Sequence, residues 1–182
     1  MIKLNAPLVH DDVKKLRIGD QVLLSGVIYT ARDSAHQKLV DMLAAGKKLP
    51  FDPKGSVIYY VGPSPAKPNQ VIGAAGPTTS YRMDPFVIDL LKVGMKGMIG
   101  KGARSEEVKK GIVDYTGVYL GATGGAAALL AKSITEAEVI AFPELGPEAV
   151  RRLVVKDMPL IVVNDCHGAD LYEKGVEDYR LD

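Results

Sequence analysis

The sequence predicts a mixed α/β protein whose strands are covered on both faces. Two observations carry this prediction. The β-branched and aromatic runs are short and almost continuously apolar, as in strands that are buried on both sides. Segments with helical spacing fall between several of these runs. With 182 residues, of which 47% are hydrophobic and 25% charged, the chain is expected to form a single domain, 1–182, with a substantial core.

Six segments have the composition of strands, and the first is the longest. Its apolar run is interrupted only at Ser25 and Gly26 and is too short to span a membrane. In chain order the expected strands are 22–29, 56–61, 95–99, 118–120, 138–141 and 160–163. A helix cannot cross the proline-rich segment 62–68, which is expected to be an ordered loop or hinge. The charged, weakly periodic segment 173–182 is expected to be a surface tail.

Three helix starts are marked by residues that typically cap free backbone N–H groups. Ser34 and Gln37 have the spacing of a capping box, with an apolar stripe after them. Asp84 is expected to cap the next helix, with Pro85 in its first turn. Ser105 is expected to cap a third helix.

Positively charged side chains stand directly before these helix starts. Arg32 precedes the first start, Arg82 the second, and Lys101 and Arg104 the third. Because a helix N-terminus already carries about half a positive charge, cations are unfavourable there unless an anion lies between them. If the strand ends converge, as in open α/β sheets, the cations form an anion site. For any single junction the favoured alternative is that the cation pairs with a nearby Asp or Glu or extends into solvent.

Two glycine-rich segments have backbones that a ligand can approach closely. The segment 73–79 ends in the hydroxyls of Thr78 and Thr79, and the segment 121–126 places Thr123 at a helix start. Tight turns and close helix packing explain both segments equally well. Neither segment has the Walker A or the Rossmann glycine pattern, so nucleotide binding is disfavoured.

Charge, cysteine and histidine content restrict the function further. The net charge of +1 gives no overall field that favours nucleic acid.

Cys166 is the single cysteine and is expected to be a buried, inert thiol that does not face His167. Alone it cannot hold zinc or an iron–sulfur cluster. His36 is expected either to donate to an anion at its helix start or to lie on the surface. Without a signal peptide or a long apolar run, the protein is expected to be cytoplasmic, with no membrane partner.

Six segments together resemble a known family. In order they are 31–39 (ARDSAHQKL), 76–84 (GPTTSYRMD), 101–105 (KGARS), 119–131 (YLGATGGAAALLA), 142–150 (FPELGPEAV) and 160–165 (LIVVND). They resemble the β subunit of two-subunit class I fumarases and L(+)-tartrate dehydratases, which corresponds to the C-terminal domain of single-chain class I fumarases. The resemblance implies a swivelling β/β/α domain with a mixed sheet and flanking helices.

The resemblance also implies a reaction and the residues that serve it. Arg32, Arg82 and Lys101 would bind the carboxylates and hydroxyl of a small dicarboxylic acid, and Thr78 would serve in acid–base chemistry at carbon. Further possible site residues are His36, Thr79 and Arg104. A [4Fe–4S] cluster would be held by the partner α subunit, with no metal on this chain. The implied reaction is the reversible hydration of fumarate to malate; tartrate dehydration and a stand-alone anion-binding module are the alternatives.

Overall fold

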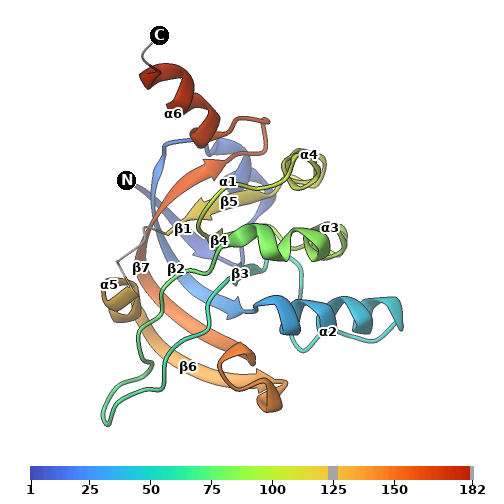
Figure 1. The fold of residues 1–182 in the computed structure, drawn as a ribbon, viewed down its shortest axis with the longest axis vertical. Coiled ribbons are helices and arrows are strands. Elements are labelled where there is room, and N and C mark those ends of the chain that lie inside the picture. The colour runs from blue at the N-terminus through green and yellow to red at the C-terminus, as the bar shows by residue number, and fades with distance from the viewer. Residues whose placement is uncertain (123–126, 181–182) are drawn as a thin grey trace.

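The computed structural model describes residues 1–122 and 127–180 (Figure 1). Its strands are β1 (Ile2–Ala6), β2 (Gln21–Thr30), β3 (Val57–Tyr59), β4 (Gly97–Gly100), β5 (Val118–Gly121), β6 (Ile134–Ala141) and β7 (Val150–Asn164). Its α-helices are α1 (His10–Lys15), α2 (Asp33–Ala44), α3 (Asp84–Lys92), α4 (Glu106–Asp114), α5 (Ala127–Lys132) and α6 (Leu171–Tyr179), and its 3₁₀ helices are η1 (Ser80–Met83) and η2 (Pro143–Glu148). Within the described residues, no helix has the length and apolar character needed to cross a membrane.

The strands form one mixed sheet that closes on itself. Strands β1 to β5 are parallel neighbours in chain order, and β7 runs antiparallel to β2, β5 and β6. The long strand β2 pairs with β7 along most of its length, with β1 near its start and with β3 at Tyr29 and Thr30. Because β7 also pairs with β5, the path β2–β3–β4–β5–β7 returns to β2. Closure of this kind leaves no free edge along that path.

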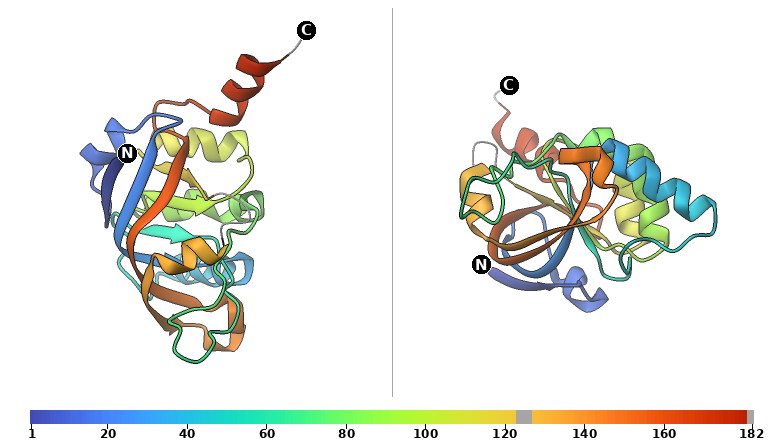
Figure 2. Two further views of the ribbon diagram at one scale, coloured as in Figure 1. Left: turned by 90° about the vertical axis from the view of Figure 1, so that its left-hand side faces the viewer. Right: turned by 90° about the horizontal axis from the view of Figure 1, so that it is seen from below.

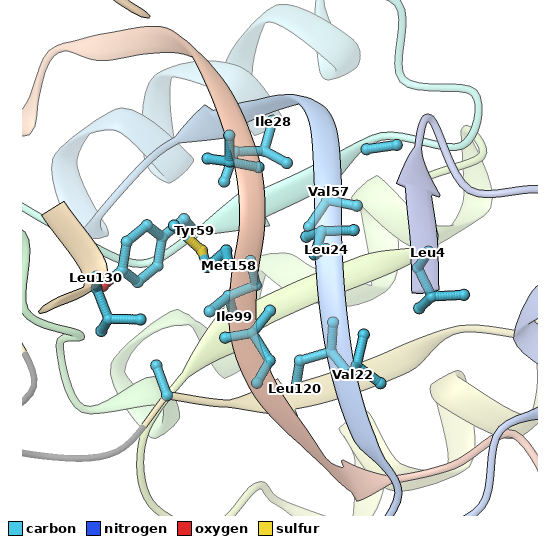
Figure 3. Close-up of a cluster of buried hydrophobic side chains, with 14 of the residues drawn as sticks. Leu4, Val22, Leu24, Ile28, Val57, Tyr59, Ile99, Leu120, Leu130 and Met158 are labelled. Carbon is cyan, nitrogen blue, oxygen red and sulfur yellow. The ribbon is translucent and has the colours of Figure 1, made fainter. Parts of the chain in front are cut away.

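Apolar side chains from the strands fill the interior of the closed sheet (Figure 3). Ile28 of β2 and Met158 of β7 are fully buried there, together with Val57 and Tyr59 of β3. Ile58 lies between those two β3 residues in sequence and belongs to a different cluster, because successive strand side chains point to opposite faces. The sheet therefore separates two apolar cores.

Helices α2, α3 and α4 lie side by side against the outside of the parallel strands (Figures 1 and 2). The second core fills the space between them and the sheet. It contains Met98 of β4 and one buried residue from each helix: Leu39 from α2, Leu90 from α3 and Ile112 from α4. The predicted mixed sheet with flanking helices is therefore confirmed.

Each expected strand is present, but its limits differ, and the sequence does not predict β1. In β1 only Leu4 and Ala6 are buried, so the strand lacks the continuous apolar run that marks the others. Strand β7 starts at Val150, well before the expected 160–163, because charged and polar residues interrupt its apolar pattern. Strand β6 is mostly exposed or half-buried, so the expectation that it is covered on both faces is wrong.

The expected capping box at the start of α2 is wrong. The helix begins at Asp33, with Arg32 in the capping position and no side-chain cap. Ser34 already lies in the first turn, where its N–H donates to the Glu148 carboxylate at 3.2 Å. Gln37 instead donates from Nε2 to Asp41 Oδ1 at 2.9 Å, one turn further along the helix.

Of the other two expected caps, the one at Asp84 is wrong and the one at Ser105 is confirmed. Helix α3 continues directly from η1, so Asp84 is already helical and caps nothing in its own helix. Its carboxylate instead accepts the N–H of Ser105 at 2.7 Å, which joins the starts of α3 and α4. The Ser105 hydroxyl caps α4 as expected and accepts the N–H of Val108 at 3.3 Å.

The expected surface tail 173–182 is helical for most of its described length. Asp170 caps α6 by accepting the N–H of Tyr172 at 2.8 Å. Lys109 of α4 lies 3.3 Å from Asp170 and 2.5 Å from Glu173, which attaches α6 to the rest of the protein. Helix α6 buries none of its residues, so its surface position agrees with the expectation, and residues 181–182 lie outside the described part.

Candidate active site at the ends of the parallel strands

The segment that carries Thr78 returns to the sheet between the ends of β3 and β4. On one side the N–H of Thr78 donates to the carbonyl of Tyr60 at 2.7 Å, just beyond β3. On the other side Thr79 pairs with Lys101, and the N–H of Ser80 donates to the Lys101 carbonyl at 2.9 Å. The fold therefore brings the segments of Thr78 and Lys101 side by side, which their separation in sequence does not reveal.

Arg32 lies at the carboxyl end of the neighbouring strand, β2. Its Nη2 is 3.5 Å from Oε1 of Glu148, and about a quarter of each side chain is exposed. Gly62, which follows β3, leaves room for the guanidinium, since a Cβ there would lie 2.6 Å from Arg32 Nη1. The Nε of Arg32 is buried and has no hydrogen-bond partner among the described residues. Arg32 therefore keeps an unused donor.

Arg82 lies in η1 and forms an ion pair with Asp33, the first residue of α2. Because Asp33 directly follows Arg32, this pair brings the two arginines onto adjoining segments. The Arg82 side chain is 41% exposed and that of Asp33 33%, so water screens their attraction. Oδ1 of Asp33 is buried and has no partner in the described part of the chain.

Lys101 differs from both arginines. It is exposed at the end of β4 and forms no ion pair with the residues that the structure describes. The next residue, Gly102, has a φ of +83°, a left-handed conformation that glycine adopts without strain. Two of the three expected substrate-binding cations thus pair with carboxylates, which the residue pattern allowed as the alternative, and the third does not.

Arg104 is buried rather than facing solvent. Its side chain is 0% exposed, and its Nε donates to Asp84 Oδ1 at 2.7 Å. The guanidinium also packs against the rings of Tyr60 and Tyr119, with its carbon 5.3 and 4.9 Å from their centroids. These contacts bury Arg104 between the sheet and α3 and indicate a structural role. The other three cations, Arg32, Arg82 and Lys101, are exposed or half-exposed.

His36 is also buried, so the expectation of a surface histidine is wrong. Its Nδ1 lies 2.9 Å from the carbonyl oxygen of Arg32, and burial lowers its pKa to about 4. The ring is therefore neutral near pH 7, with its proton on Nδ1, because a carbonyl only accepts. Nε2 keeps its lone pair and has no partner among the described residues, so His36 cannot donate a second hydrogen bond to an anion.

Comparison with known proteins gives the family. A family model described as Fumarase C-terminus matches residues 1–175. The chain belongs to this family. A protein of Methanocaldococcus jannaschii, named as a candidate L(+)-tartrate dehydratase subunit beta, is 47% identical over 173 residues, which cover 92% of this chain and 89% of that protein. The family resemblance of the sequence motifs is therefore confirmed.

Longer members of the Fumarase C-terminus family are also similar. Fumarate hydratase 1, mitochondrial, of Leishmania major is 41% identical over 179 residues, or 96% of this chain and 32% of that protein. The anaerobic class I fumarate hydratase of Escherichia coli is 38% identical over 178 residues, or 95% of this chain and 32% of that protein. The chain spans about a third of the length of these fumarate hydratases.

In this Fumarase C-terminus chain, Thr78 and Thr79 are half-buried beside the Lys101 loop. No carboxylate or imidazole within residues 1–122 and 127–180 hydrogen-bonds to either hydroxyl. A threonine hydroxyl of ordinary acidity is a poor base. The described part of the chain therefore positions Thr78 without activating it.

Cys166 lies away from these residues, beside α1. Its Sγ is 3.8 Å from the Val13 carbonyl oxygen and 3.6 Å from Nε2 of His167. The expectation that the two neighbouring side chains do not face each other is wrong, because His167 turns back to contact the end of α1 through the Lys14 carbonyl at 2.9 Å. The thiol is half-buried, so the expectation that it is buried is wrong, but its partial burial raises its pKa, which agrees with an inert thiol.

Sequence reasoning missed the groups that surround the expected cations. Asp33 adjoins Arg32 in sequence, so its position was a usable signal for a partner of a nearby cation. Glu148 and Tyr119 carry no such signal, because their contacts depend on how η2 and β5 pack in the fold. Thr123, expected at the start of a helix, lies outside the described residues.

Proposed function

We propose that this chain is the subunit of an iron–sulfur hydro-lyase that does not hold the cluster, and that it catalyses the reversible hydration of fumarate to malate only with its α subunit. The proposal is supported by the placement of the expected site residues on neighbouring segments: Arg32 follows β2, Arg82 in η1 pairs with Asp33 beside it, and the Thr78 segment lies against Lys101 at the end of β4. We also propose that the chain is a swivelling β/β/α domain.

The charge of these residues suits a dicarboxylate. Elimination of water from malate removes a proton from the carbon beside a carboxylate, so negative charge accumulates on that carboxylate in the transition state. Fixed cations at this position lower the barrier. The planar guanidinium groups of Arg32 and Arg82 match carboxylates in a bidentate way, and Lys101 adds a point charge.

The ion pairs seen without substrate are compatible with this role. The Arg82–Asp33 pair is 41% and 33% exposed, and exposed pairs contribute at most about 1 kcal/mol; the Arg32–Glu148 pair is less exposed but long, at 3.5 Å. A substrate carboxylate can therefore replace Glu148 or Asp33 at small cost. Each arginine is kept oriented by its own carboxylate until the substrate arrives.

Thr78 is proposed to accept the proton from carbon during dehydration and to return it during hydration. The hydroxyl needs a base to take its own proton, and no carboxylate or imidazole of the described residues hydrogen-bonds to it. We therefore assign the activating group to the α subunit. Thr79 is proposed to orient the substrate beside Thr78.

The residues of this chain do not fit a [4Fe–4S] cluster. Such clusters need several thiolates, and the chain has one cysteine. The described residues also contain no group of three metal-ligating side chains. The proposal accordingly assigns the cluster to the α subunit, and each role given above belongs to residues of this chain.

Tartrate is the second candidate substrate, because a relative that matches nearly the whole chain carries the tartrate dehydratase name. Anaerobic co-expression of this chain with its α subunit separates the candidates: turnover of malate and fumarate that exceeds turnover of L(+)-tartrate supports the fumarase, and the reverse supports the tartrate dehydratase. This chain alone is expected to be inactive. A stand-alone anion-binding module would bind dicarboxylates without forming a complex or turning them over.

A further inference from the structure

The hydroxyl of Tyr119 hydrogen-bonds to both loops that hold Thr78 and Lys101 of the proposed site. Tyr119 lies in β5 and is fully buried. Its Oη donates to the carbonyl oxygen of Gly102 at 2.9 Å and lies 2.8 Å from Oγ of Ser80. Ser80 follows the Thr78–Thr79 segment, and Gly102 follows Lys101.

The proton count fixes the direction of both bonds. A carbonyl oxygen only accepts, so the one proton of the Tyr119 hydroxyl goes to Gly102. Ser80 must then donate its own proton to Tyr119 Oη. Burial raises the pKa of Tyr119, so the hydroxyl stays protonated throughout the pH range in which enzymes work.

Two successive backbone carbonyls, those of Lys101 and Gly102, hold the Lys101 loop in place. The Lys101 carbonyl accepts the N–H of Ser80 at 2.9 Å, and the following carbonyl, that of Gly102, accepts from Tyr119. The space is closely filled: a Cβ on Gly100 would lie 2.0 Å from Ser80 Oγ. Lys101 itself is exposed and unpaired among the described residues, so its loop is held by backbone contacts rather than by its own charge.

We infer that Tyr119 is a positioning residue, whose hydroxyl couples the Thr78 segment to the Lys101 loop and sets where the Lys101 ammonium meets the substrate. This inference rests on the proposed function, because it concerns the same site. Tyr119 touches no reacting atom. Its effect on turnover is exerted through Lys101 and Ser80.

The test uses Tyr119→Phe in the anaerobic complex of both subunits. We expect kcat/KM to fall about tenfold or more, with KM for the dicarboxylate raised, because small misplacements of a binding group are costly. The control is Tyr115→Phe. Tyr115 follows the C-terminal end of α4, packs against the second core and has no hydroxyl contact with the Thr78 or Lys101 segments among the described residues. We expect this variant to keep KM within about twofold.

A double-mutant cycle with Lys101→Ala separates positioning from general structural support. If Tyr119 acts through Lys101, adding Tyr119→Phe to Lys101→Ala changes kcat/KM by less than about threefold. An equal tenfold loss in both backgrounds, or no loss in the wild-type background, overturns the inference. An inactive wild-type complex overturns the proposed function as well. If Tyr119→Phe does not assemble, Ser80→Ala replaces it in the cycle, with the same expected non-additivity.

Discussion

Arg82 and Asp33 form an ion pair that joins η1 to the first turn of α2. A second pair, Arg104–Asp84, lies nearby in sequence but differs in its surroundings. The first pair is partly open to water, whereas the Arg104 side chain is 0% exposed and that of Asp84 11%. Exposed pairs contribute little to folding, and loss of one partner of a buried pair is costly. Replacement of Arg104 is therefore expected to destabilise the fold, whereas replacement of Arg82 is expected to leave its stability nearly unchanged.

Arg104→Ala is expected to destabilise the fold by about 3–5 kcal/mol, because it leaves the Asp84 carboxylate without its buried partner. Urea unfolding of the isolated chain measures this change. Lys92→Ala, which removes an exposed pair with Asp89, is the control and is expected to leave the unfolding midpoint unchanged. Equal midpoints for the two variants would contradict a structural role for Arg104.

His36 is expected to make stability depend on pH. Burial lowers its folded-state pKa from 6.5 to about 4, so the unfolded chain takes up a proton at this residue before the folded chain does. The contribution of His36 is thus complete above about pH 6.5 and is lost as pH falls towards 4; over that range it amounts to roughly 3 kcal/mol.

The measurement for His36 is the free energy of unfolding at several pH values in wild type and His36→Phe. The variant is expected to show a flatter pH dependence between 6.5 and 4, whatever its absolute stability. His10→Gln, at an exposed histidine, is the control and should reproduce the wild-type slope. A His36→Phe curve parallel to wild type would exclude a buried neutral His36.

Gly62→Ala is expected to impair the enzyme more than the fold. The new Cβ would lie 2.6 Å from Arg32 Nη1 and 3.2 Å from its Cδ, so the flexible arginine must move away from its place. We expect kcat/KM of the complex to fall roughly tenfold or more, with thermal stability nearly retained. Gly175→Ala is the matched control, since nothing lies within 4 Å of that Cβ. Unchanged kcat/KM for Gly62→Ala would mean that the position of Arg32 does not matter.

Local sequence patterns predict the elements of this fold better than their assembly. The apolar run of β2 and the Ser105 cap of α4 depend on neighbouring residues, and both are found as expected. The closure of the sheet depends on β2 pairing with β7, more than a hundred residues later in the chain, and no local pattern carries that information.

The candidate site shows the same division. The cations Arg32 and Arg82 were detectable because a positive charge before a helix start is unfavourable without a nearby anion. Their carboxylate partners, and the burial of His36, follow from the way α2, η1 and η2 pack together. The link from Tyr119 to Gly102 likewise requires β4 and β5 to be neighbours.

The most direct test of the central claim is kcat/KM of the two-subunit complex with Arg82→Ala, measured beside its melting temperature. Loss of a contact that strengthens in the transition state should cost about 2–4 kcal/mol, or about 30- to 1000-fold in kcat/KM. Arg82→Lys should not restore it, because lysine lacks the planar fork. Since the Arg82–Asp33 pair is partly exposed, the melting temperature should stay within a few degrees of wild type. A complex that turns over normally while the variant loses stability would show that Arg82 is a structural ion-pair residue, and would contradict the dicarboxylate site.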